Sequence, residues 1–182
     1  MYGIVNQTIQ GLVVDNFGQN KWELIKKLSG VNNDYFISDE SYDDDITFEL
    51  VAAASEVLEI SSEEILRAFG EYWIVKTGYE KYGDLMKAGG ENLFEFMCNL
   101  PNFHGRIMLI YPNLNPPEFM VERLGERELV LHYYSTRKGL TEFVVGLING
   151  LAKMFSESIE IKLLKSEYTD VWHDVFHVRI IN

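Results

Sequence analysis

Residues 127–137 read Arg-Glu-Leu-Val-Leu-His-Tyr-Tyr-Ser-Thr-Arg, and the order of elements around this stretch decides the fold class. Apolar and aromatic residues of this kind are typical of strands, and the pattern predicts strands over 118–124 and 127–134 with a turn at Gly125. An amphipathic helix is predicted to follow over 139–155. Further on, two alternating apolar runs predict an antiparallel pair that closes the domain: Ile159, Ile161 and Leu163, then Phe176, Val178 and Ile180.

The first two thirds of the chain have a helical pattern instead. Apolar residues recur at helical spacing from Ile4 to Val13 and from Trp22 to Leu28, and Gly18 and Gly30 are expected to end these two helices. Because helices come first and strands follow with one inserted helix, the pattern predicts an α+β fold. We expect a helical lobe and a second lobe with a small antiparallel sheet.

The middle of the chain is predicted to hold several shorter helices. The acidic residues 34–45 are interpreted as a solvated loop before a helix over 47–58; a calcium site is the alternative, although the ligand spacing of a calcium loop is missing. Ser61 and Glu64 form a capping box for a helix that is expected to end by Gly78. The last helices are expected over 91–100 and 102–111, before a break that contains Pro112, Pro116 and Pro117.

Composition narrows the functional classes. Sixteen Lys and Arg against 28 Asp and Glu give a formal net charge of −12, which argues against binding to nucleic acid or to an anionic membrane. Cys98 is the one cysteine, lies in an apolar stretch, and is expected to be buried. With no internal disulfide possible, no signal-peptide pattern and no apolar run of membrane-spanning length, we expect a cytoplasmic protein.

The end of the opening stretch is a candidate anion site. If residues 133–137 are extended, Tyr133, Ser135 and Arg137 project to the same side of the strand. That side offers a phenol, a hydroxyl and a guanidinium, and arginine can bind a carboxylate through two parallel hydrogen bonds. A polar sheet face would show the same pattern, so these residues alone leave both interpretations open.

His104, in the stretch Leu-Pro-Asn-Phe-His-Gly-Arg-Ile, is the second candidate. On a helix it shares a face with Ile107 and Met108. A lone histidine on an apolar face is usually a hydrogen-bonded core residue. The functional alternative is an axial ligand to haem iron, with the neutral imidazole nitrogen in an apolar pocket.

Taken together, these motifs resemble the H-NOX (haem nitric oxide/oxygen binding) domain, which includes the sensory domain of the soluble guanylate cyclase beta subunit. The resemblance covers essentially the whole chain and implies one H-NOX domain, 1–182, with a distal helical lobe of about 1–60, a proximal lobe of about 61–182, and haem between them. Besides the two candidates, the matching segments are Met1–Asn6, Leu50–Ser55, Phe69-Gly70, Asn99-Leu100, Tyr111-Pro112, Pro117, His132 and Gly139-Leu140.

The resemblance implies a site for haem b, iron protoporphyrin IX, position by position. His104 would be the proximal iron ligand, and Tyr133, Ser135 and Arg137 would hold the propionates. Pro117 would press on the porphyrin from the proximal side. The other residues expected to contact the cofactor are Met108, and, in the distal part, Val5, Ile4, Trp73, Phe143 and Leu147.

The resemblance also implies which gases are bound. Oxygen-binding relatives carry a tyrosine donor at the position of Phe143, and phenylalanine has no donor. Trp73 falls on the other polar distal position and is expected to pack against the haem edge; the alternative is that its indole N–H points to the iron and donates to a bound gas. NO and CO have less need of a donor, so we expect stable complexes with them and none with oxygen. An oxygen-tolerant gas-binding or haem-storage protein without a signalling partner is the alternative.

The resemblance implies a sensor and not an enzyme, and the sequence shows no Ser-His-Asp set, phosphate-binding glycine loop or paired-carboxylate motif. NO would release His104 from the iron, and the haem would relax against Pro117 and Val5. Because the chain ends soon after the strand over 175–181, without a linker, we expect a free-standing domain. Its effector would be a separate histidine kinase or diguanylate cyclase.

Overall fold

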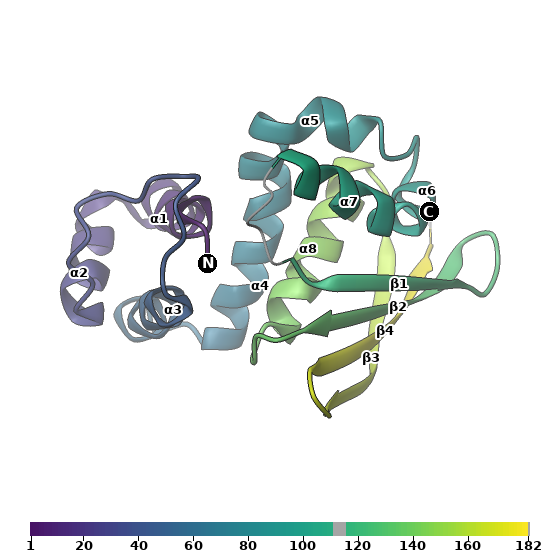
Figure 1. Cartoon of the computed structure of the whole chain (residues 1–182). Coiled ribbons are helices and arrows are strands. Elements are labelled where there is room, and N and C mark those ends of the chain that lie inside the picture. Colours follow the sequence, from purple (N-terminus) through teal and green to yellow (C-terminus); the bar gives the residue numbers. More distant parts are fainter. Residues whose placement is uncertain (111–115, 182) are drawn as a thin grey trace. The chain divides into compact units, whose positions relative to one another are not determined.

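The computed structural model describes residues 1–110 and 116–181 (Figure 1). The chain forms two compact units: unit 1 is Met1–Trp73 with Glu142–Leu147, and unit 2 is Ile74–Thr141 with Ile148–Asn182. Unit 1 therefore includes a short segment from the last third of the sequence. The expected division into a distal lobe of about 1–60 and a proximal lobe of about 61–182 stays a prediction.

Unit 1 consists of helices whose apolar faces form one core. The helix α4 belongs to this unit because it packs against both α1 and α3. Fully buried side chains come from each of these helices, among them Ile9, Ile25, Leu50 and Phe69. The elements are α1 (Gly3–Phe17), α2 (Gln19–Ser29), α3 (Asp44–Leu58), α4 (Ser62–Tyr72) and the first half of α8 (Thr141–Met154).

The glycines after α1 and α2 and the capping box of α4 confirm the predictions from sequence, whereas α3 begins at Asp44, three residues before the helix expected over 47–58. Gly18 and Gly30, with φ of +85° and +69°, follow α1 and α2. The side chain of Asp43 caps α3 by accepting a hydrogen bond from the amide of Asp45, so part of the acidic run has a local structural role. Ser61 and Glu64 form the complete capping box of α4.

Unit 2 combines short helices with a four-stranded antiparallel sheet. The strand order is β1-β2-β4-β3, and α6 and α7 both contact the edge strand β1 (Figure 1). The elements are α5 (Tyr79–Lys87), α6 (Leu93–Cys98), α7 (Leu100–Ile110), β1 (Glu118–Arg123), β2 (Glu128–Ser135), β3 (Ile159–Tyr168) and β4 (Trp172–Ile180). The α+β fold and both strand pairs agree with the prediction.

The expected helix end at Gly78 is wrong. A π-helical segment, η1 (Trp73–Gly78), continues α4 directly into α5. Gly78 has right-handed helical angles, φ −67° and ψ −44°, so it propagates the helix instead of terminating it, and α5 was missed for the same reason. The expected helix over 102–111 corresponds to α7, but its last residue and the motif Tyr111-Pro112 lie outside the described residues.

Candidate functional site

The eleven candidate residues divide between the two units. His104, Met108, Pro117 and the Tyr133–Ser135–Arg137 group lie in unit 2. The five residues expected in the distal part lie in unit 1: Ile4, Val5, Trp73, Phe143 and Leu147. Each group is therefore assembled within one unit.

His104 is oriented by its own helix. Its Nδ1 lies 3.2 Å from the backbone carbonyl oxygen of Leu100, one turn earlier in α7. A carbonyl oxygen can only accept, so Nδ1 carries the proton and Nε2 keeps its lone pair. Burial lowers the pKa of His104, and the hydrogen bond to Leu100 opposes that effect in part. The ring is therefore neutral at pH 7, in the tautomer that leaves Nε2 available to a metal.

Aromatic rings connect His104 to the sheet. The imidazole lies 4.9 Å from the ring of Phe119 and 5.8 Å from that of Phe103, measured between centroids. Phe119 in turn lies 5.4 Å from Tyr133, its cross-strand neighbour. The imidazole and the anion-binding candidates thus belong to one continuous aromatic wall. Phe119 was not singled out from the sequence, because a phenylalanine in a predicted strand is indistinguishable from any other core residue.

Tyr133 and Ser135 share the buried face of β2, as alternation along a strand predicted. Their exposed fractions are 3% and 5%. Burial raises the pKa of the Tyr133 phenol; the side-chain hydrogen bond with Ser135 and the charge of Arg137 lower it, and the charge of Asp174 raises it. The phenol therefore stays protonated at neutral pH and can donate a hydrogen bond to an anion.

Arg137 is positioned by a turn and not by the strand. The strand β2 ends at Ser135, so the expectation of a third residue on the extended face is corrected. The Arg137 amide donates to Ser135 Oγ at 3.0 Å, which bends the chain back beside the strand end. The guanidinium nevertheless lies close enough to affect the Tyr133 phenol electrostatically.

The remaining candidates of unit 2 flank this wall. Pro117 is half-buried and directly precedes β1. Met108 lies one helical turn after His104 and is 43% exposed, so it is not a core residue of the polypeptide alone. At i+4 from His104 on α7 it shares a helix face with the imidazole, and its contact with the cofactor stays a prediction.

The candidates of unit 1 are held by packing. Phe143 lies 4.6 Å from Phe69 between ring centroids. Ile4 is buried, whereas Val5, Trp73 and Leu147 are half-buried. Phe143 and Leu147 lie one turn apart in α8, and among the described residues no ring pair or side-chain hydrogen bond joins two of these five candidates. Their predicted role at the cofactor stays a prediction.

The donor set in unit 2 fits haem. A neutral imidazole with a fixed Nδ1 proton suits the iron, and a phenol, a hydroxyl and a guanidinium suit two propionate carboxylates. The aromatic wall between them suits the porphyrin plane. Across the described residues, no three His, Cys, Asp or Glu side chains gather closely enough to hold a metal ion by themselves. A single histidine is one of the ligand sets that hold haem iron, because the macrocycle supplies the other donors.

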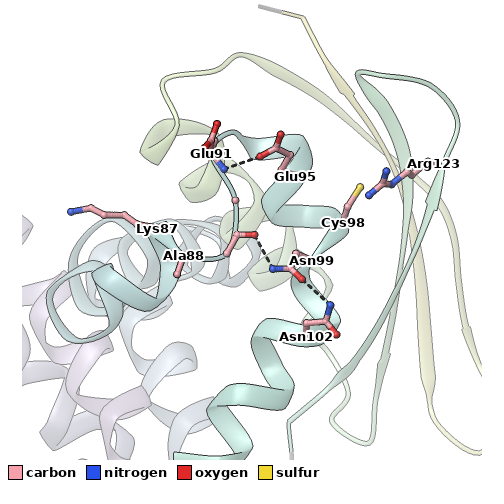
Figure 2. Close-up of a pocket in the computed structure, with 10 residues that line it drawn as sticks. Lys87, Ala88, Glu91, Glu95, Cys98, Asn99, Asn102 and Arg123 are labelled. Atoms are coloured by element: carbon pink, nitrogen blue, oxygen red, sulfur yellow. Dashed lines mark hydrogen bonds between the residues drawn. The ribbon is translucent and has the colours of Figure 1, made fainter.

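A separate open cleft of about 800 Å³ lies elsewhere in unit 2 (Figure 2). Its lining comes mainly from the α5–α6 loop and α6, with single residues from α5, α7 and β1, and includes none of the eleven candidates. Cys98 lies in this lining and is half-exposed, which corrects the expectation that it is buried. The reason is that Cys98 ends the short α6, whose buried face is occupied by Leu93, Phe96 and Met97.

Comparisons of sequence show the family to which the chain belongs. The family model described as "Haem-NO-binding" matches residues 2–163. The soluble guanylate cyclase gcy-31 of Caenorhabditis elegans is 27% identical over 177 residues, which cover 96% of this chain and 24% of that protein. Guanylate cyclase soluble subunit beta-2 of Rattus norvegicus is 38% identical over 96 residues, 53% of this chain and 14% of that one. The chain thus spans about a quarter or less of these relatives.

Solved structures share the fold. An H-NOX protein from S. oneidensis, in the Fe(II)NO ligation state, matches with a TM-score of 0.88 at 19% identity, over 100% of both chains. An oxygen-binding H-NOX domain related to soluble guanylate cyclases, solved as its oxygen complex, matches with a TM-score of 0.83 at 22% identity, over 100% of this chain and 96% of that chain.

The fold is thus that of H-NOX haem domains, a class of gas sensors. The chain belongs to the haem-NO-binding (H-NOX) family, related to the haem domains of soluble guanylate cyclase. Among the described residues, no helix is both long and apolar enough to cross a membrane.

Proposed function

We propose that this chain is a sensor that binds NO and CO at ferrous haem b, forms no stable oxygen complex, and signals to a separate histidine kinase or diguanylate cyclase. The observation that carries the proposal is the state of His104. Its pKa is lowered by burial, and its Nδ1 donates to Leu100, so that Nε2 is a ready iron ligand.

The residues of unit 2 have distinct tasks in this proposal. Haem, when bound, would supply a ferrous iron that takes a diatomic gas, and NO would weaken the bond between the iron and His104. Tyr133, Ser135 and Arg137 hold the propionates, and Pro117 limits how the porphyrin can flatten. His104, once released, stays neutral and keeps its bond to Leu100, so release needs no change of tautomer.

Discrimination against oxygen rests on Phe143 in this proposal. Bound oxygen carries partial negative charge and is stabilised by a hydrogen-bond donor, which a phenyl ring lacks. Phe143 packs its ring against that of Phe69, and both side chains are apolar. CO and NO need no such donor and would be retained.

Absorption spectra of the ferrous protein alone, in air, with CO and with NO would test the proposal. We expect a haem Soret band in the purified protein, distinct CO and NO spectra, and no oxy-haem spectrum in air. The band shift that marks loss of the histidine ligand should appear with NO and not with CO. A stable oxy-haem spectrum would refute the oxygen part, and a protein without haem would refute the whole.

Signalling has its own test. We expect His104→Gly, reconstituted with haem and free imidazole, to hold a co-purified effector in one signalling state whether or not NO is present. Wild-type protein should switch the effector's activity on addition of NO. A His104→Gly variant that responds to NO as the wild type does would contradict signalling through His104 release.

A further inference from the structure

Asp174 is a buried carboxylate in β4 that has no role so far. It is 2% exposed. Its Oδ2 accepts a hydrogen bond from Thr141 Oγ1 at 2.7 Å, and its Oδ1 accepts one from Ser166 Oγ at 2.5 Å. A buried carboxylate is retained only where such donors compensate for its lost hydration. All three residues belong to unit 2.

The position of Asp174 relates it to the propionate-binding candidates. In the register of β2 and β4 it lies directly opposite Tyr133. Its charge raises the pKa of the Tyr133 phenol and so helps to keep the phenol protonated. Because a carboxylate repels an anion, Asp174 cannot itself contribute attraction for a propionate. If Asp174 favours propionate binding, it must therefore do so through the residues that donate hydrogen bonds to it.

Thr141 connects Asp174 to the turn that carries Arg137. It is the first residue of α8 and follows Arg137 by four residues. The turn between them is tied at its start by the hydrogen bond from the Arg137 amide to Ser135 Oγ, and at its end by the bond from Thr141 to Asp174. Between the two ties, Gly139 has a φ of +79°, a conformation that other residues adopt with strain.

We propose that Asp174 is a positioning residue: through Thr141 it fixes the turn that presents Arg137 to a haem propionate. This inference rests on the proposed haem function. Ser166 belongs to β3 and not to the turn, and it donates to the other oxygen of the same carboxylate. The two hydroxyl donors to Asp174 are therefore a matched pair, of which one belongs to the turn after Arg137 and the other does not.

The test compares Thr141→Val with Ser166→Ala in the haem-loaded protein. Each variant removes one hydroxyl donor from Asp174, and valine keeps the shape of threonine. Two quantities would be measured: the rate of haem transfer to excess apomyoglobin, and the propionate bending band in the resonance Raman spectrum. Arg137→Gln would serve as the reference variant. We expect Thr141→Val to lose haem about tenfold faster and to shift the band towards that of Arg137→Gln, whereas Ser166→Ala stays within about twofold of wild type.

Thermal unfolding of both variants would separate positioning from stability. Thr141→Ser keeps the hydroxyl and should retain haem as the wild type does, even if Thr141→Val folds poorly. Equal haem loss by Thr141→Val and Ser166→Ala, an unshifted propionate band in Thr141→Val, or a Thr141→Ser variant that loses haem rapidly would overturn the positioning role alone. A wild-type protein that takes up no haem would instead overturn the proposed function on which this inference rests.

Discussion

In unit 2 the candidate residues are held by directional bonds, and in unit 1 they are held by shape. His104, Ser135 and Arg137 each have a hydrogen-bond partner no more than four residues away in sequence. Phe143 and its neighbours instead depend on the approach of two helices that are distant in sequence. Local hydrogen bonds leave a motif in the sequence, whereas helix packing is recorded mainly in the size of the residues at the contact.

Gly70 and Gly146 show how close that approach is. A Cβ atom on Gly70 would lie 2.1 Å from the carbonyl oxygen of Phe143, and one on Gly146 would lie 2.1 Å from that of Arg67. Beside this crossing, Arg67 forms an ion pair with Glu142 at 2.5 Å. The first half of α8 therefore belongs to unit 1 because two glycines let α4 and α8 touch through their backbones.

The largest expected effect concerns unit 2, where hydrogen bonds hold the candidate residues. Replacing His104 with Gly removes the proposed iron ligand, so we expect haem loss at least about tenfold faster than in wild type, with recovery on addition of free imidazole. Haem transfer followed at the Soret band would measure this. His177→Gln is the matched control, since His177 pairs with Glu128 on the sheet and should matter little. Unchanged haem retention in His104→Gly would mean that the cofactor is not held by this residue.

The next largest effect concerns unit 1, where the packing of α4 against α8 holds the candidate residues. Gly70→Ala forces the crossing of α4 and α8 apart and should lower the free energy of unfolding by about 3 kcal/mol. Gly83→Ala in α5 is the control, because its nearest neighbour is Tyr79 at an ordinary 3.8 Å and alanine favours a helix by about 1 kcal/mol. Chemical denaturation of both variants measures the difference. Equal stability of the two variants would show that the crossing is looser than described.

A smaller effect is expected on oxygen binding, and it would test the proposed role of Phe143 in unit 1. Phe143→Tyr introduces a donor, and a net hydrogen bond of about 1 kcal/mol should slow oxygen dissociation about fivefold. Flash photolysis of the CO complex in the presence of oxygen, which forms the oxygen complex transiently, measures the rate, and Phe143→Leu serves as the variant without a donor. If tyrosine and leucine behave alike, Phe143 does not face the bound gas.

The smallest effect is the pH dependence of the haem-free protein. Burial holds the pKa of His104 below its usual 6.5 in the folded state, so the unfolded chain binds more protons once the pH falls through that value. This contribution to stability is complete above about pH 6.5 and is lost as the pH falls towards the lower, folded pKa. Urea denaturation between pH 7 and 5 should therefore show a shallower decline for His104→Gln. A parallel decline would assign the pH dependence to other groups.

Several features of the fold were predictable because local residues decide them. Gly18, Gly30 and the capping box at Ser61 mark helix ends by their own conformational preferences. The helix end predicted at Gly78 was wrong because distant contacts, and not the local preference of glycine, decide this position. Its backbone is helical, since η1 continues α4 into α5. The predicted burial of Cys98 was wrong because an apolar stretch does not reveal which face of a short helix is filled by larger side chains.

The sequence by itself determined the α+β order of elements, the family, the helix that carries His104 and the strand that carries Tyr133 and Ser135. These follow from periodicity, caps and motifs, in which each residue acts on its near neighbours. Only the tertiary structure decided that α8 is shared between two units, that Phe119 links His104 to Tyr133, and that Asp174 is held by Thr141 and Ser166. Such contacts join residues far apart in the chain, and their free energy depends on distances that residue types alone do not specify.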